Sequence, residues 1–211
     1  MRGGMRLHDP THLYEGEISP KAERVANILS IAGQPVFIPI PVFILLGAGI
    51  DDPVRCILVI LVSLFFVTVI PTASTYYFSI KLGRKDGDIP DRTLRFKPMM
   101  IGVLSYVIGT VALHLMDAPD IMWVLMLCYA TVTFVMTIIT LYWKISIHSV
   151  GVIGPSMALA VTFWPWGLLY FLLFPPIAWS RYVLKRHTPA QIAAGALIGF
   201  FITGAMFLLL L

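Results

Sequence analysis

Long apolar stretches, each close to the length of a membrane-spanning helix, recur along the chain and are separated by short polar segments. A helix needs about 20 mostly apolar residues to cross the roughly 30 Å hydrocarbon layer of a bilayer. Stretches of this kind lie at about 26–50, 54–80, 99–116, 121–143, 148–163, 166–179 and 189–211. The pattern therefore predicts an all-α fold, a polytopic transmembrane helical bundle of about seven spans.

The segments between these stretches are typical of tight turns. Residues 51–53 and 117–120 contain Asp and Pro, and residues 164–166 read Trp-Pro-Trp. Proline interrupts a helix, and tryptophan prefers the membrane interface. We therefore expect three consecutive hairpins and a last span, forming a single transmembrane domain over residues 26–211 after a polar lead-in at residues 1–25.

Composition excludes a water-soluble globule of this size. Hydrophobic residues make up 58% of the sequence and charged residues only 12%. This leaves too few polar residues to cover the surface that a water-soluble protein of this size exposes. Cys56 and Cys128 both fall inside apolar stretches. Neither a disulfide framework nor a zinc site is therefore expected.

Positive charge gathers at one end of the predicted bundle. With seven crossings, all of the 15 lysines and arginines except Arg55 share the side of the N-terminus, whereas the opposite turns carry aspartates. Cytoplasmic loops of membrane proteins are enriched in Lys and Arg. We therefore expect an integral protein of the cell membrane whose lead-in and basic end face the cytoplasm.

Three pairs of polar residues converge on this basic end. They are Lys85 with Arg92, Ser146 with His148, and Arg181 with His187. Two spans separate each pair from the next, so all three return to the same side of the membrane. Lys and Arg neutralise phosphoryl oxygens, and histidine can act as nucleophile or proton donor. The set is suited to phosphoryl chemistry.

The spacing resembles that of the type-2 phosphatidic acid phosphatases, membrane phosphatases related to the vanadium haloperoxidases. The signatures of this family are Lys-x6-Arg-Pro, Pro-Ser-Gly-His and Ser-Arg-x5-His-x3-Asp. The corresponding residues here are Lys85 with Arg92-Thr93, then Ile145-Ser146-Ile147-His148, then Ser180-Arg181 with His187 and Gln191. The resemblance covers residues 85–191, about half of the chain, and implies a six-helix phosphatase-like core.

The resemblance also implies a role for each matching residue. His187 would be the nucleophile that forms a phosphohistidine, and His148 the acid that protonates the leaving alcohol. Ser146 and the cations Lys85, Arg92 and Arg181 would hold the phosphate. The implied reaction is metal-independent hydrolysis of a lipid phosphate or polyprenyl pyrophosphate, without a cofactor. Partners would be the lipid substrate and membrane lipids, and no nucleic acid.

The chain departs from the family signatures at several positions. Thr93 replaces a proline, and Ile145 and Ile147 replace a proline and a glycine. Gln191 replaces the aspartate that in the family orients the nucleophile, so it can accept the hydrogen bond but brings no charge. We expect a weaker nucleophile, compensated by an aspartate of the first loop: Asp86, Asp88 or Asp91.

Two segments carry helix-start signals. Ser19-Pro20 is a cap followed by proline at the first helical position, and Thr188-Pro189-Ala190-Gln191 fits a capping box. Gln191 therefore also has a purely structural interpretation, which is compatible with a role beside His187.

Two other functions fit these residues. A catalytically weak or inactive lipid-phosphate binding or transport protein of the same fold is favoured by Gln191. A prenyl or phospho-alcohol transferase is prompted by the aspartates of residues 86–91, but such enzymes use two carboxylate clusters to hold magnesium and the sequence has one.

Overall fold

A computed structural model describes residues 7–83, 89 and 91–211, with the backbone alone described for residues 92 and 93. All regular elements among these residues are helices. In chain order they are α1 (Pro20–Ala32), α2 (Pro39–Gly47), α3 (Pro53–Leu64), η1 (Phe65–Val69), α4 (Ile70–Lys81), η2 (Arg92–Arg95), α5 (Phe96–Leu115), α6 (Asp120–Tyr142), α7 (Ile147–Thr162), η3 (Trp166–Leu173), α8 (Phe174–Val183) and α9 (Pro189–Leu210). The expected all-α class is confirmed.

Four helices in the described part of the chain are long and apolar enough to span a membrane, which indicates a membrane protein. One is the continuous helix Pro53–Lys81, made of α3, η1 and α4, and the others are α5, α6 and α9. Pro71 lies just after the π-helical segment η1, a local adjustment that lets a helix pass a proline.

The count of seven spans is not confirmed, because three of the predicted spans are short or broken. The first is divided into α1 and α2, and the sixth consists of the 3₁₀ segment η3 followed by α8. The fifth, α7, has 16 residues. The break in the first stretch has a local cause, since Gly33 ends α1 and Pro35 and Pro39 cannot donate to a continuing helix.

Side-chain caps fix several helix starts where the sequence signals them. Ser19 Oγ accepts from the Ala22 amide at 3.2 Å, and Pro20 is the first residue of α1. Asp52 Oδ1 accepts from the Arg55 amide at 2.9 Å at the start of α3. The helix-start signal of Ser19-Pro20 is therefore confirmed.

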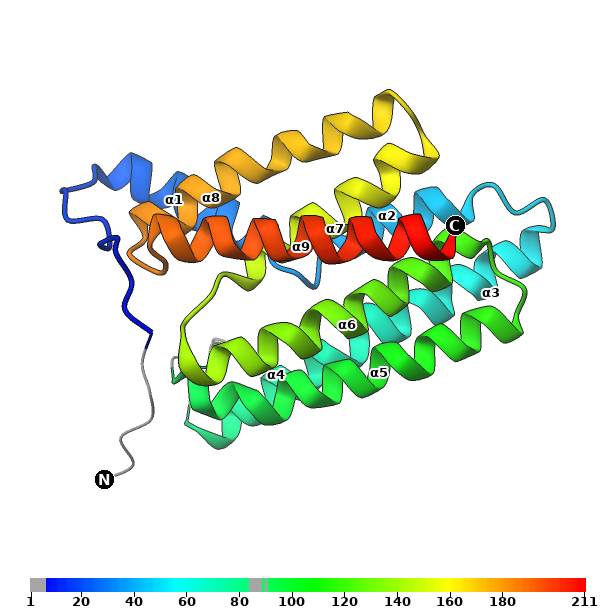
Figure 1. Cartoon of the computed structure of the whole chain (residues 1–211), viewed down its shortest axis with the longest axis horizontal. Helices are drawn as coiled ribbons and strands as arrows, with labels where there is room; N and C mark the ends of the chain where they lie inside the picture. Colours follow the sequence, from blue (N-terminus) through cyan, green and yellow to red (C-terminus); the bar gives the residue numbers. More distant parts are fainter. Residues whose placement is uncertain (1–6, 84–88, 90) are drawn as a thin grey trace.

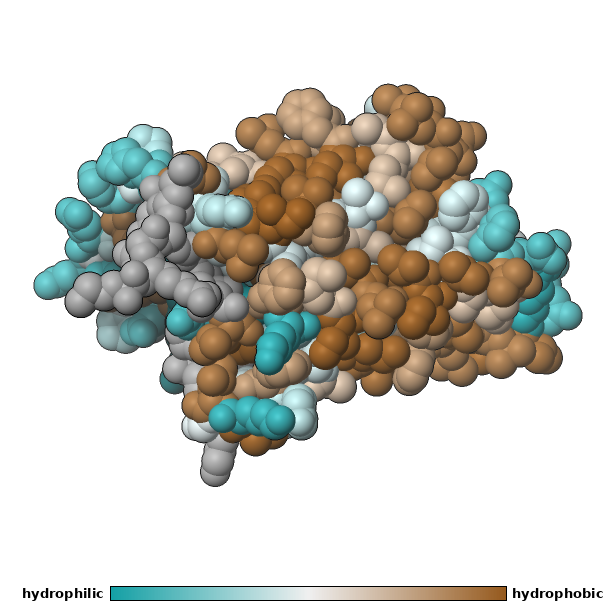
Figure 2. Space-filling view, turned by 60° about the horizontal axis from the view of Figure 1, so that its bottom comes forward, coloured by the Kyte–Doolittle hydropathy of each residue, from teal (hydrophilic) through white to brown (hydrophobic). Residues whose placement is uncertain are grey.

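The interior is apolar and centres on α6, which packs against α5, α7 and α9. Phe43, Met122, Leu125 and Met126 are almost fully buried there. Much of the outer surface is apolar as well, and Figure 2 shows a broad hydrophobic band with hydrophilic residues gathered at its two ends. Such a band is what a lipid-facing surface requires.

The two ends of the bundle differ in which segments they gather (Figure 1). The end of α4, the starts of α5 and α7, the end of α6, and the turn between α8 and α9 lie toward one end, which we call the site end. The turns after α2, α5 and α7 lie at the other end with the C-terminus. Arg55, the cation expected apart from the others, is at this second end. Its guanidinium donates to the backbone carbonyls of Met116 and Asp117, so it ties α3 to the turn after α5.

Candidate functional site

His187 is presented by a tight turn between α8 and α9. The Arg186 amide donates to the Arg181 carbonyl at 3.0 Å and the Lys185 amide to the Tyr182 carbonyl at 2.9 Å. This is the Schellman pattern that ends a helix, with Lys185 in the left-handed region at φ 56°. The His187 amide also donates to the Arg181 carbonyl, at 3.2 Å. The turn therefore places His187 beside Arg181, directly before α9.

The start of α9 forms the expected capping box. The Gln191 amide donates to Thr188 Oγ1 at 3.3 Å, and the Thr188 amide donates to Gln191 Oε1 at 3.3 Å. A backbone amide can only donate, so the atom of the Gln191 side chain that faces it must be the oxygen. The capping box therefore fixes the orientation of this side-chain amide.

That orientation determines the tautomer of His187. Nδ1 of His187 lies 3.2 Å from the same Gln191 Oε1. Because an amide oxygen only accepts, Nδ1 must carry the proton, and the neutral ring then has a bare lone pair on Nε2. Gln191 thus has both of the roles expected from the sequence, as a helix cap and as the partner of His187.

His148 has the opposite tautomer. It is the second residue of α7, and its Nε2 lies 3.2 Å from the backbone carbonyl of Ser30 in α1. A carbonyl only accepts, so Nε2 of His148 carries hydrogen. Nη1 of Arg181 donates to the hydroxyl of the same Ser30 at 2.6 Å. One serine therefore brings His148 and Arg181 together.

Close packing of α7 against α9 holds the two histidine-bearing helix starts side by side. A side chain at Gly195 would begin 2.5 Å from the carbonyl oxygen of Ser146 and 3.2 Å from Cβ of Ser149. The Ser146 amide in turn donates to the Gln191 carbonyl at 3.2 Å. Gly195 thus permits the backbone approach that places His148 near His187.

The electrostatic surroundings of His187 are positive. Burial, followed by the positive charges of Arg181 and Lys144, lowers the pKa of His187 to about 2, against an ordinary value of about 6.5. His187 and His148 also lie within electrostatic reach of each other. At neutral pH His187 is therefore an uncharged imidazole surrounded by cations, which is an environment suited to an anion.

Of the remaining expected site residues, the structure describes the side chain of Ser146. Ser146 is fully buried, and its hydroxyl caps α7 by accepting from the Ser149 amide at 3.4 Å and from the Ser149 hydroxyl at 3.0 Å. Lys85 lies outside the described residues, and the side chain of Arg92 is not among those described. Of the expected members, the structure thus brings together His148, Arg181, His187 and Gln191, with Ser146 capping the helix of His148.

The aspartate that the structure places beside the capping box is Asp9, from the N-terminal segment, which accepts from Thr188 Oγ1 at 2.6 Å. Of the aspartates expected to compensate for Gln191, Asp86 and Asp88 lie outside the described residues, and Asp91 is exposed at the turn before η2. Asp9 was not anticipated from the sequence, although Asp-Pro-Thr is typical of a turn in which the Asp side chain bonds two residues on.

Two further neighbours of the site were missed as well. Ser30 lies in the last turn of α1, and nothing in the sequence around it indicates a contact with α7 or α8. Lys144 counted only toward the charge asymmetry, yet it acts electrostatically on His187. Its position two residues before Ser146 is the sequence feature that could have indicated a place near the site.

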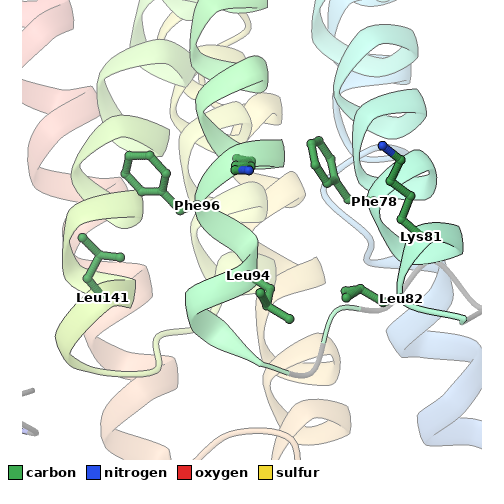
Figure 3. Close-up of a pocket in the computed structure, with 7 residues that line it drawn as sticks. Phe78, Lys81, Leu82, Leu94, Phe96 and Leu141 are labelled. Carbon is green, nitrogen blue, oxygen red and sulfur yellow. The ribbon is translucent and has the colours of Figure 1, made fainter. Parts of the chain in front are cut away.

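A pocket of about 380 Å³ also lies at the site end, among α4, η2, α5 and α6. Figure 3 shows its mostly apolar lining, which includes Phe78, Leu94 and Phe96, with Lys81 and Lys97 as its cations. Neither histidine of the candidate site lines it. Within the described ranges, no group of three or more His, Cys, Asp or Glu side chains is placed to hold a metal ion.

Comparisons of the chain with protein-family models, with curated proteins and with solved structures find no match. The chemistry of the site is therefore inferred from its own residues and their geometry.

Proposed function

We propose that this protein is a metal-independent membrane phosphatase that hydrolyses a lipid phosphate or a polyprenyl pyrophosphate through a phosphohistidine intermediate. The observation that carries the proposal is the complementary pair of tautomers beside one arginine. His187 offers a bare Nε2, His148 offers an Nε2–H, and Arg181 lies next to both.

In the first step Nε2 of His187 attacks the phosphorus atom, and the bond from phosphorus to the leaving oxygen breaks. The dianionic phosphate brings negative charge next to Arg181 and His148, which favours the imidazolium form of His148. His148 then donates its Nε2 proton to the leaving oxygen, so a neutral alcohol or a lipid monophosphate departs.

In the second step water attacks the phosphohistidine. His148, now neutral, takes a proton from the water as the oxygen bonds to phosphorus, and the bond from phosphorus to Nε2 of His187 breaks. Inorganic phosphate leaves, His187 is again the neutral Nδ1–H form, and His148 releases to solvent the proton that it had gained when the substrate bound. Arg181 balances the charge on the phosphoryl oxygens throughout, with its planar set of donors. To do so, it exchanges its bond to Ser30 for one to the substrate.

The proposal includes the orientation of the protein. The site end carries the basic segments, and the positive-inside rule then favours a cytoplasmic N-terminus and site in the cell membrane. The same proposal includes seven membrane crossings. The four long helices make four of them, α7 makes one, and the two broken stretches, α1 with α2 and η3 with α8, make one each.

A second candidate is a lipid-phosphate binding or transport protein of the same fold. Gln191 favours it, because this side chain brings no negative charge to stabilise a histidine that becomes cationic on phosphorylation. In this case the site holds a phosphate head group without breaking a bond.

The test is phosphate release by purified protein in detergent, from a diacylglycerol phosphate and from a polyprenyl pyrophosphate. We expect His187→Gln to abolish release and His148→Gln to slow it by about 100-fold or more. With substrate labelled in the transferred phosphate, quenching in alkaline SDS briefly after mixing should leave label on the wild type that later acid treatment releases, and none on His187→Gln.

His114→Gln is the matched control, because His114 lies at the end of α5, exposed and edge-on to Trp123 at the other end of the bundle. It should keep wild-type turnover. Unchanged release by folded His187→Gln contradicts the phosphatase. Saturable binding of the lipid phosphate by a wild type that releases none favours the binding protein instead.

A further inference from the structure

The N-terminal segment lies across the start of α9 through Asp9 and Thr11. The hydroxyl of Thr188 donates to Asp9 Oδ2 at 2.6 Å and accepts from the Gln191 amide at 3.3 Å. The hydroxyl of Thr11 donates to Asp9 Oδ1 at 2.7 Å and accepts from the Ala190 amide at 3.3 Å. Two hydroxyls therefore link one carboxylate to two amides of the first turn of α9.

A separate contact holds the same segment against α8. The ring of Tyr14 meets Tyr182 edge to face, with centroids 5.4 Å apart. Such a pair contributes about 0.5–1.5 kcal/mol beyond its buried area. Asp9 is thus brought to α9 by a segment that is anchored on both helices flanking the His187 turn.

The carboxylate of Asp9 is ionised at neutral pH. Burial by itself would raise the pKa of Asp9, but hydrogen bonds from Thr188, Thr11 and Gln191 outweigh it and hold the pKa below its ordinary value. The positive end of the α9 dipole favours the same charge state. A fixed negative charge therefore lies beside the capping box.

The side-chain amide of Gln191 lies between Asp9 and His187. Its oxygen is committed to the Thr188 amide and to Nδ1 of His187, so its nitrogen is the end that can donate to Asp9. A carboxylate at the nitrogen end polarises the amide and makes its oxygen a stronger acceptor.

We propose that Asp9 is a positioning residue for His187, supplying through the Gln191 amide the negative charge that a glutamine lacks. The inference deepens the phosphatase proposed above and rests on it for its kinetic consequence. Asp9 strengthens the hydrogen bond from Nδ1 of His187 to Gln191, and it stabilises the positive charge that develops on the ring during attack. Asp9 does not touch the substrate.

The test compares wild type, Asp9→Asn, and Asp9→Asn combined with Gln191→Glu, which places a carboxylate directly on α9. Glu15→Gln is the control, because it removes an exposed carboxylate from the same segment. Two quantities are measured on each protein in detergent: the proton chemical shift of the His187 Nδ1–H group by NMR of ¹⁵N-labelled histidine, assigned by its loss in His187→Gln, and the kcat and KM for a lipid phosphate.

We expect the wild type and Glu15→Gln to show the same downfield Nδ1–H shift of His187 and equal kcat. Asp9→Asn should keep the tautomer that the capping box fixes, but it should move this shift upfield and lower kcat about tenfold with little change in KM, as loss of an outer partner of a functional histidine does. The double variant should recover both the shift and kcat. If Asp9 only tethered the N-terminal segment to α9, a carboxylate at position 191 would restore neither.

Asp9→Asn protein with the wild-type Nδ1–H shift and kcat overturns the inference, and so does a double variant that recovers neither. If Asp9→Asn does not fold, the double variant is compared with the wild type directly, and the same recovery or loss decides. A wild type without turnover contradicts the phosphatase, whereas the Nδ1–H shift of His187 still decides the role of Asp9.

Discussion

Nδ1 of His187 lies 3.2 Å from Oε1 of Gln191, at the position where the phosphatase signature has an aspartate. The same oxygen accepts from the Thr188 amide, so the cap of α9 and the tautomer of His187 depend on one atom. A glutamine can do both because its carbonyl oxygen has two lone pairs.

Removal of this oxygen should therefore destabilise the protein. Gln191 is almost fully buried, and Gln191→Leu leaves two buried donors without their acceptor. We expect a loss of about 2 kcal/mol in the free energy of unfolding, measured by denaturant titration in detergent. Gln191→Glu keeps the acceptors and the capping box and should remain within about 0.5 kcal/mol of the wild type. Equal stability of Gln191→Leu and wild type would contradict the double role of this oxygen.

Gly195→Ala should disturb the contact between α7 and α9. The added methyl group meets the backbone carbonyl of Ser146 at 2.5 Å, and backbone cannot turn away as a side chain can. We expect a loss of about 1–3 kcal/mol in the free energy of unfolding together with weaker binding of lipid phosphate. Gly199→Ala is the control on the same helix, since its nearest atoms lie at 3.4 Å. The packing argument fails if both variants unfold alike.

Lys185→Gly should stabilise the turn before His187. Lys185 is exposed and has φ 56°, a conformation that glycine adopts without the strain of a Cβ. The expected gain is about 1 kcal/mol, visible as a higher Tm in detergent. Lys185→Ala, which removes the same charge but keeps a Cβ, should show no such gain. A lower Tm for Lys185→Gly than for Lys185→Ala would contradict this description of the turn.

Acid should destabilise the protein through His187. Its pKa is lower in the folded state, so the unfolded chain binds more protons at every pH between about 6.5 and about 2. Stability is therefore complete above pH 6.5 and is lost as the pH falls. The part due to His187 is about 2 kcal/mol between pH 6.5 and 4.5.

The measurement is the free energy of unfolding of wild type and His187→Gln across this pH range. The variant should lose less stability on acidification, because it has no imidazole at position 187, whose protonation in the folded state is opposed by burial and by the positive charges of Arg181 and Lys144. His114→Gln, at an exposed histidine, should follow the wild-type curve. Parallel curves for wild type and His187→Gln would show that His187 titrates alike in both states.

Several features of the fold follow from the sequence because their causes are local. The last predicted span, about 189–211, is α9 at Pro189–Leu210, and the fourth, about 121–143, is α6 at Asp120–Tyr142. Apolar runs of this length have few alternatives to a membrane helix. The capping box at Thr188 and Gln191 was equally predictable, since both partners lie within one turn.

The first stretch shows where hydrophobicity alone misleads. Residues 26–50 are mostly apolar, yet Gly33, Pro35 and Pro39 divide them into α1 and α2. A hydropathy pattern indicates whether a segment lies in lipid or in water, whereas backbone hydrogen bonding decides whether the helix continues.

The sequence by itself determined that this is an all-helical, apolar protein with histidines and cations returning to one end of a bundle. Only the tertiary structure decided their partners: Ser30 for His148 and Arg181, and Asp9 for the cap of α9. The physical reason is that these contacts join residues more than a hundred positions apart. Which carbonyl or carboxylate reaches a histidine is set by how closely the helices pack, and at Gly195 that distance depends on a missing side chain.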